Sequence, residues 1–321
     1  MTAVMGKGME LAKSYYETFG APMLQEQFPS LLPLIAVGLT GSGSECFGYD
    51  DEVSSDHDYE PGFCIFLPGE DVVDRRTAFA LERAYAKLPK EYGGFTRSLM
   101  QPAGGPRRGV LRMADFFASR VGSGDGALTP AQWLGVPDTM FAEAVNGEIF
   151  YDGSGEMTRI RSVLSDCPED IRRKKLAGAL LLMAQSGPYN YERCVRHGET
   201  GAAQMAVFEF VRHTMEAVFL LNRTWRPFYK WSFRAMRSLP SLSLLAELLE
   251  YLLVTDNDEE LAASKQEVIE GIAADISDEL ARQELTKAVC GDLEKHAWSV
   301  NDGIADASVR NMNILAGVSS L

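Results

Sequence analysis

Two acidic residues separated by one position, Asp56 and Asp58, are the side chains in this sequence best suited to chemistry. In an extended segment, residues i and i+2 point to the same side, so the two carboxylates would lie next to each other. Adjacent carboxylates repel each other and are costly to bury unless a cation neutralises them. Mg²⁺ is usually held by one or two carboxylates together with substrate phosphates. The spacing therefore predicts a metal site at Asp56 and Asp58 that binds Mg²⁺.

A glycine-serine turn lies upstream of these acids. The apolar run from Leu34 to Leu39 predicts a buried strand, and Gly43 and Ser44 follow it. Glycine lets the backbone approach a ligand closely, and the N–H groups of such a turn can bind phosphate oxygens. Ser44 could also cap a short following helix, a role compatible with phosphate binding. Gly43 and Ser44 are therefore predicted to bind a triphosphate.

The spacing of this turn and the two acids resembles the nucleotidyltransferase signature of the polymerase-β-like superfamily. The residues that carry the resemblance are Gly43, Ser44, Gly48, Ser55, Asp56 and Asp58. The resemblance implies an α+β fold, with a mixed sheet and flanking helices followed by an all-helical domain. It also implies a Mg²⁺-dependent enzyme that transfers a nucleoside monophosphate, in the first instance AMP from ATP, to a hydroxyl group of an acceptor.

A third carboxylate usually completes such a site, as general base or further metal ligand. The predicted neighbouring strand, residues 110–113, carries no acid, which is the main departure from the superfamily pattern. Asp115 lies just beyond that strand, where it could instead cap a helix, and Glu60 lies two residues after Asp58. A cation at Asp56 and Asp58 would make Glu60 a ligand rather than a base. We therefore expect Asp115 to be the third carboxylate.

The second half of the chain has a different character, because helical patterns dominate from about residue 156. We expect a nucleotidyltransferase-like domain over residues 1–155 and a helical substrate-binding domain over residues 156–321. Helices are predicted at residues 170–185, 202–222, 229–237, 243–253, 259–274, 277–296 and 304–315.

Residues 189–193, 219–223 and 226–231 resemble an uncharacterised bacterial group of nucleotidyltransferase-domain proteins with a helical C-terminal half. Among these residues, Arg193 and Lys230 are the candidates for contacts with nucleotide phosphates. Trp231 could stack on a base, although aromatic residues at helical spacing often pack in a core. His197 follows Arg193 too closely for the ribonuclease motif of some helical partners of these domains, which argues against a nuclease.

Composition narrows the class of partner. The net charge is −14, and such a field repels nucleic-acid phosphates, so a small-molecule acceptor is favoured over nucleic acid. No apolar run is long enough for a membrane span, and the N-terminus lacks the pattern of a signal peptide. Five scattered cysteines without a CxxC motif predict reduced thiols in a cytoplasmic protein. The oligomeric state is left open.

Two alternatives to the enzyme stay open. The chain could bind a triphosphate without turnover, as a regulatory protein, and the missing third carboxylate favours that possibility. It could also be an antitoxin-like enzyme that attaches AMP to a protein or to tRNA.

Overall fold

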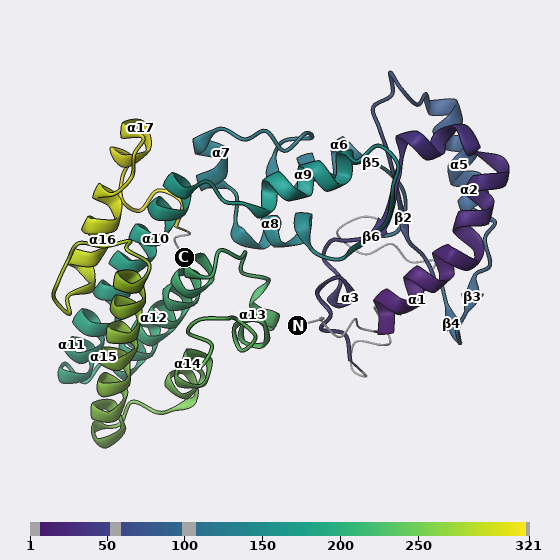
Figure 1. Ribbon diagram of the computed structural model, residues 1–321. Helices are drawn as coiled ribbons and strands as arrows, with labels where there is room; N and C mark the ends of the chain where they lie inside the picture. The colour runs from purple at the N-terminus through teal and green to yellow at the C-terminus, as the bar shows by residue number, and fades with distance from the viewer. Residues whose placement is uncertain (1–6, 52–58, 98–106, 319–321) are drawn as a thin grey trace. The chain divides into compact units, whose positions relative to one another are not determined.

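The chain folds into two compact units (Figure 1). The computed structural model describes residues 7–51, 59–97 and 107–318. Unit 1 contains Met1–Leu128 and Met140–Ser165, and unit 2 contains Thr129–Thr139 and Asp166–Leu321. The division is therefore not a single point in the sequence, because a short segment of unit 2 interrupts unit 1.

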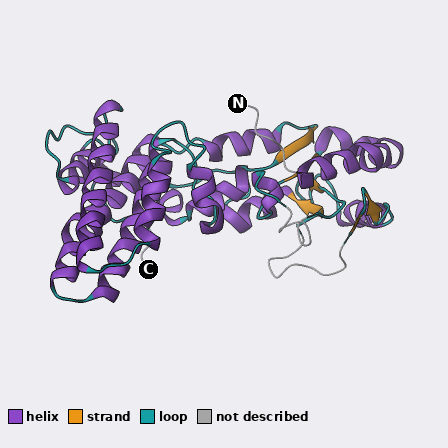
Figure 2. Ribbon diagram, turned by 90° about the horizontal axis from the view of Figure 1, so that it is seen from below, coloured by secondary structure: helices purple, strands orange, loops and turns teal. Residues whose placement is uncertain are grey.

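Strands and helices are distributed unequally between the units. Unit 1 holds a four-stranded mixed sheet with flanking helices, whereas unit 2 is mostly helical (Figure 2). This arrangement confirms the predicted α+β class.

The sheet of unit 1 has the strand order β5-β2-β1-β6. Strand β1 pairs antiparallel with β2 and β6, and β2 pairs parallel with β5. Every residue of β1 and β2 is buried, which explains why their sequences are continuous apolar runs rather than alternating ones. The strands are β1 (Ala36–Leu39), β2 (Cys64–Leu67), β5 (Gly109–Arg112) and β6 (Glu148–Asp152).

Aromatic side chains fill the core on one side of this sheet. Phe63, which directly precedes β2, is fully buried and packs against the rings of Tyr15, Tyr16 and Tyr85. Gly20 makes room for it, because a Cβ there would lie 2.3 Å from the Phe63 ring. The other elements of unit 1 are α1 (Lys7–Tyr15), a π-helical turn (Tyr16–Gly20), α2 (Ala21–Gln27), a 3-10 helix (Pro29–Leu34), α3 (Ser44–Phe47), α5 (Arg75–Ala86), the hairpin β3 (Glu91–Tyr92) and β4 (Phe95–Thr96), α6 (Met113–Val121), most of α8 (Asp138–Val145) and α9 (Glu156–Ser165).

Unit 2 is built around a buried helix, α10 (Glu169–Ala184), which packs against α12 (Thr200–Leu221) and α16 (Leu293–Asp302) (Figure 1). Its Lys174 side chain is fully buried, and Nζ donates to Asn301 Oδ1 at 2.8 Å and to the carbonyls of Arg310 and Met312 at 3.0 and 2.7 Å. These bonds match the three donors of an ammonium group and fasten the C-terminal segment to α10. The remaining helices of unit 2 are α7 (Pro130–Gly135), a π-helical segment (Gln185–Tyr191), α11 (Glu192–Arg196), α13 (Tyr229–Met236), α14 (Leu245–Val254), α15 (Glu259–Arg282) and α17 (Ala307–Arg310).

The helix predictions near the C-terminus were partly wrong. The helix expected at residues 304–315 is only the four-residue α17 (Ala307–Arg310). The helices expected at residues 259–274 and 277–296 are instead the continuous α15, a non-helical stretch and then α16. Ser277 lies inside α15 and does not begin a second helix. Its hydroxyl donates to the Ala273 carbonyl at 2.9 Å within the same helix. The helix ends where Glu284 takes a positive φ of 56°.

Within the described residues, no helix combines the length and the apolar character needed to cross a membrane.

Candidate functional site

A pocket of about 610 Å³ opens in unit 1 beside the turn that follows β1. Its walls come from this turn, from α3, from Cys64 at the start of β2, from Arg107 and β5, and from α6. The volume falls within the range of small-molecule sites. Ser42, Gly43 and Asp115 all line it, so the glycine-serine turn and the candidate third carboxylate lie at one cavity.

Asn146 holds the turn in place through three hydrogen bonds. Its Oδ1 accepts from the Thr40 hydroxyl at 3.0 Å and from the Gly41 N–H at 2.9 Å. Its Nδ2 donates to the Gly41 carbonyl at 2.7 Å. The next residue, Gly147, lies so close to the end of β1 that a Cβ would come 2.0 Å from the Leu39 carbonyl oxygen. The turn is therefore fixed by the segment between α8 and β6, about a hundred residues further along the chain.

Replacing Asn146 with Asp is expected to loosen this turn. The change removes the one bond that Asn146 donates and places a carboxylate oxygen against the Gly41 carbonyl, at a cost on the order of 1–3 kcal/mol. Hydrogen-deuterium exchange of a peptide covering residues 40–44 should become faster. Asn311→Asp, at an exposed position, serves as the control. Unchanged exchange in this peptide would show that Asn146 does not hold the turn.

The space beside Gly43 is occupied by a carboxylate of the protein itself. A Cβ at Gly43 would lie 2.2 Å from Glu45 Oε2, and Glu45 is only 2% exposed. Arg108 compensates this buried charge, with its Nη2 at 3.0 Å from Glu45 Oε1 and its Nη1 at 3.9 Å from Glu60 Oε2. The Glu45 carboxylate therefore favours glycine at position 43, in addition to the predicted close approach of a phosphate, which stays a prediction.

Three arginines line the pocket: Arg107, Arg112 and Arg120. The Arg120 guanidinium lies over the Phe116 ring, 3.9 Å from its centroid, and against Gly41, where a Cβ would be 3.0 Å from Nη2. Burial lowers the pKa of Arg120, and Glu143 opposes this effect from 3.8 Å. An arginine remains charged under these conditions, so Arg120 places a positive charge directly at the turn.

The arginines outnumber the acids at this pocket. The two lining carboxylates are Asp115 and Glu45, and the latter is already paired with Arg108. The pocket is therefore suited to an anion, although the chain as a whole is strongly acidic.

The two cysteines at the pocket are not suited to nucleophilic catalysis. Burial raises the pKa of Cys64 to about 12 and raises the pKa of Cys46 well above its usual range. Cys64 Sγ also donates to the Arg107 carbonyl at 3.2 Å. Both side chains are therefore neutral thiols at physiological pH, and the thiolate is the reactive form.

Of the two predicted phosphate-binding residues, Gly43 lines the pocket and Ser44 is not among its lining residues. Gly43 lines the pocket together with Ser42, whereas Ser44 is 3% exposed and lies in the first turn of the short helix α3. The sequence contains two consecutive Gly-Ser pairs, Gly41-Ser42 and Gly43-Ser44, and the predicted phosphate-binding site includes only the second. The repeated pair is the signal that could have indicated Ser42.

The predicted metal ligands Asp56 and Asp58 lie outside the described residues. Among the residues that are described, no three histidine, cysteine, aspartate or glutamate side chains are grouped closely enough to hold a metal ion. Glu60 precedes β2 rather than belonging to it, and it faces Arg108.

Asp115 is exposed in the first turn of α6. The N-cap residue of this helix is Arg112, so the alternative role of Asp115 as N-cap is wrong. Strands β2 and β5 run parallel with Leu67 opposite Arg112, so Asp115 follows the C-terminal end of this pair. In chain order, Asp56 and Asp58 precede its N-terminal end.

Arg193 and Lys230, predicted to contact phosphates, are both exposed in unit 2, on α11 and α13. The Arg193 guanidinium lies 5.1 Å from the Tyr189 ring centroid, and Lys230 Nζ lies 4.3 Å from that of Trp231. Trp231 itself is buried, as expected for a core residue. A role for Arg193 or Lys230 at the nucleotide stays a prediction.

The fold and this pocket define a two-unit α+β protein with an arginine-lined cavity at a glycine-serine turn. Residues 133–232 match a family model described as "Domain of unknown function (DUF4037)". The match includes Asn146, which holds the turn, and the helices α10, α11 and α12 of unit 2. Comparison with curated proteins gave no match.

Proposed function

We propose that this protein is a nucleotidyltransferase that transfers a nucleoside monophosphate from a nucleoside triphosphate, in the first instance AMP from ATP, to a hydroxyl of a small-molecule acceptor. The observation that carries the proposal is the pocket beside the turn after β1, where Arg120 lies against Gly41 and two more arginines line the wall. An anion-binding pocket at this turn, followed in sequence by Asp56 and Asp58, is what binding of a triphosphate requires.

Each group of residues at the pocket would have a separate role in the transfer. Arg120 and the turn residues Ser42 and Gly43 would bind and orient phosphate oxygens, and the Asn146 bonds would keep the turn rigid while they do so. Mg²⁺ held by Asp56 and Asp58 would supply charge neutralisation for the departing pyrophosphate. Asp115, at the same pocket, would accept the proton of the acceptor hydroxyl. The net charge of −14 favours a small acceptor over nucleic acid.

Arg120→Gln is expected to weaken ATP binding by about tenfold or more, because it removes a charged hydrogen-bond donor from a partly buried site. Calorimetric titration with ATP and Mg²⁺ measures the effect. Arg159→Gln is the matched control, since Arg159 lies on α9 of the same unit and its side chain is 51% exposed. If Arg120→Gln is folded and binds ATP with the same affinity as the wild type, Arg120 does not contribute to the ATP site.

A second candidate function is binding of a triphosphate without turnover, as in a regulatory protein. It is favoured by the position of Asp115, which follows the C-terminal end of the β2–β5 pair, while the two acids of the motif precede its N-terminal end in the chain. Pyrophosphate release during a screen of hydroxyl-bearing acceptors separates the two functions. If Asp115→Asn releases pyrophosphate as fast as the wild type, Asp115 is not the base.

A further inference from the structure

Unit 2 contains its own polar pocket, of about 500 Å³, which the proposed function does not use. Four charged side chains of both signs and two aromatic rings line it: Asp138, Lys175, Glu216, Arg226, Phe228 and Tyr229. All of them belong to unit 2, so the pocket is distinct from the arginine-lined cavity in unit 1.

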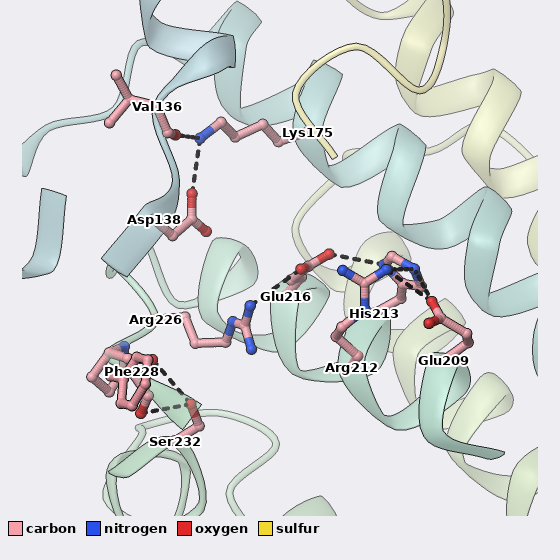
Figure 3. Close-up of polar contacts among 11 residues, drawn as sticks. Val136, Asp138, Lys175, Glu209, Arg212, His213, Glu216, Arg226, Phe228 and Ser232 are labelled. Atoms are coloured by element: carbon pink, nitrogen blue, oxygen red, sulfur yellow. Dashed lines mark hydrogen bonds and ion pairs between the residues drawn. The ribbon is translucent and has the colours of Figure 1, made fainter. Parts of the chain in front are cut away.

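One wall presents a carboxylate oxygen. Lys175 Nζ bonds to Asp138 Oδ1 at 2.8 Å and to the Val136 carbonyl at 3.3 Å (Figure 3). The Lys175 side chain is 4% exposed and lies over the Trp225 ring, so its ammonium group interacts with the protein rather than with a ligand. Within the described chain, Asp138 Oδ2 has no hydrogen-bond donor facing it. Asp138 therefore offers one oxygen to a ligand.

The opposite charge comes from Arg226. Among the described residues, its guanidinium has a single polar contact, from Nη2 to Glu216 Oε1 at the long distance of 3.3 Å, and its buried Nε has none. Glu216 is held on its other side by His213, whose Nδ1 lies 2.9 Å from Oε2 (Figure 3). A guanidinium has five N–H donors, so most of the hydrogen-bonding capacity of Arg226 is not met by the described residues.

The partner of Arg226 stays charged. Burial alone would raise the pKa of Glu216, but the His213 hydrogen bond and the charges of His213, Arg226 and Arg212 outweigh it, and the pKa is lowered. Glu216 therefore fixes the Arg226 side chain by its charge and leaves most of the guanidinium donors for another acceptor.

An aromatic rim adjoins Arg226. The rings of Phe228 and Tyr229 have centroids 4.3 Å apart, yet these residues are 45% and 72% exposed. Ser232 Oγ donates to the carbonyls of Pro227 and Phe228 at 3.0 and 3.4 Å, which fixes the backbone that carries the rim (Figure 3). Large exposed rings held in place at a pocket are suited to stacking against a planar group.

We infer that this pocket binds a zwitterion with a planar ring, of the aromatic amino acid class. The ligand carboxylate would bind Arg226, its ammonium group would bind Asp138 Oδ2, and its ring would stack on Phe228 or Tyr229. The lining charges cancel, two acids against two bases, which suits a molecule carrying one charge of each sign. A nucleotide fits less well, because its several negative charges would face Asp138, Glu216 and the acidic chain.

Three compounds of similar shape test this inference: L-phenylalanine, 3-phenylpropanoate without the amino group, and 2-phenylethylamine without the carboxylate. All four tryptophans of the chain lie in unit 2, and Trp225 lies beside Lys175, so tryptophan fluorescence of the full chain can follow the titration. Phenylalanine is expected to bind at least about tenfold more tightly than either analogue. Equal affinity for phenylalanine and 3-phenylpropanoate, or no binding of phenylalanine at millimolar concentration, overturns the inference.

Variants locate the binding. Tyr229→Ser changes an exposed ring and should weaken phenylalanine binding several-fold without affecting folding. Tyr189→Ser removes another tyrosine, 59% exposed and not at this pocket, and should have no effect. Arg226→Gln should bring the affinity for phenylalanine down to that for 2-phenylethylamine. Wild-type affinity in both Tyr229→Ser and Arg226→Gln contradicts binding here. Because none of these readouts involves ATP, failure of this inference leaves the proposed function untouched.

Discussion

Replacing Asp56 with Asn is expected to reduce pyrophosphate release from ATP by about a thousandfold. The substitution removes one charge at nearly constant volume. Neutralisation of phosphate charge by a bound cation contributes several kcal/mol to the transition state, and each 1.4 kcal/mol corresponds to about tenfold in rate. Asp58→Asn should have a similar effect. The measurement is the rate of pyrophosphate release on any acceptor that the wild type turns over.

His57→Asn is the matched control, because His57 lies between the two acids in the sequence and should point to the opposite side of an extended segment. It should retain most of the activity. The metal assignment is wrong if Asp56→Asn and His57→Asn lose similar amounts of activity, or if Asp56→Asn loses none.

Replacing Arg108 with Ala is expected to destabilise unit 1 by about 3–5 kcal/mol. The change leaves the Glu45 carboxylate buried without its guanidinium, and the two side chains are only 8% and 1% exposed in the intact pair. Burial of an uncompensated charge is far more costly than loss of a surface pair. The same variant should also weaken ATP binding, since Glu45 lies against Gly43 at the pocket.

Denaturant unfolding can assign this effect to unit 1. Because every tryptophan lies in unit 2, tryptophan fluorescence follows that unit alone, while hydrogen exchange of β1 and β2 peptides follows unit 1. Arg75→Ala is the control, because the Arg75–Glu70 pair is highly exposed and its loss should leave the stability of unit 1 nearly unchanged. A loss below about 1 kcal/mol for Arg108→Ala would mean that the buried pair does not hold α3 in place.

The order of the main elements was predictable because each has a strong local signal. The apolar run that forms β1, the strand that becomes β5 and the amphipathic helices of unit 2 follow from residue periodicity. Prediction failed at α15, where Ser277 resembles a helix start but bonds within the helix. Local pattern cannot distinguish these two roles of serine, because both satisfy its hydroxyl.

The wall of the candidate site was not predictable from sequence. Asn146 bonds to Gly41 across 105 residues, and Arg120 lies against Gly41 through the packing of α6. Glu45 is an ordinary surface-type residue by composition, and its burial depends on Arg108, 63 residues away. Such contacts arise from tertiary packing, whereas the glycine-serine turn and the two acids could be recognised because their spacing is local.

The most direct test of the proposed function is calorimetric titration of the full chain with a non-hydrolysable ATP analogue, with and without Mg²⁺. The proposal predicts one site per chain, with affinity at least about tenfold higher in Mg²⁺, and with this gain abolished in Asp56→Asn but kept in His57→Asn. Absence of binding, or equal affinity with and without Mg²⁺, would contradict it.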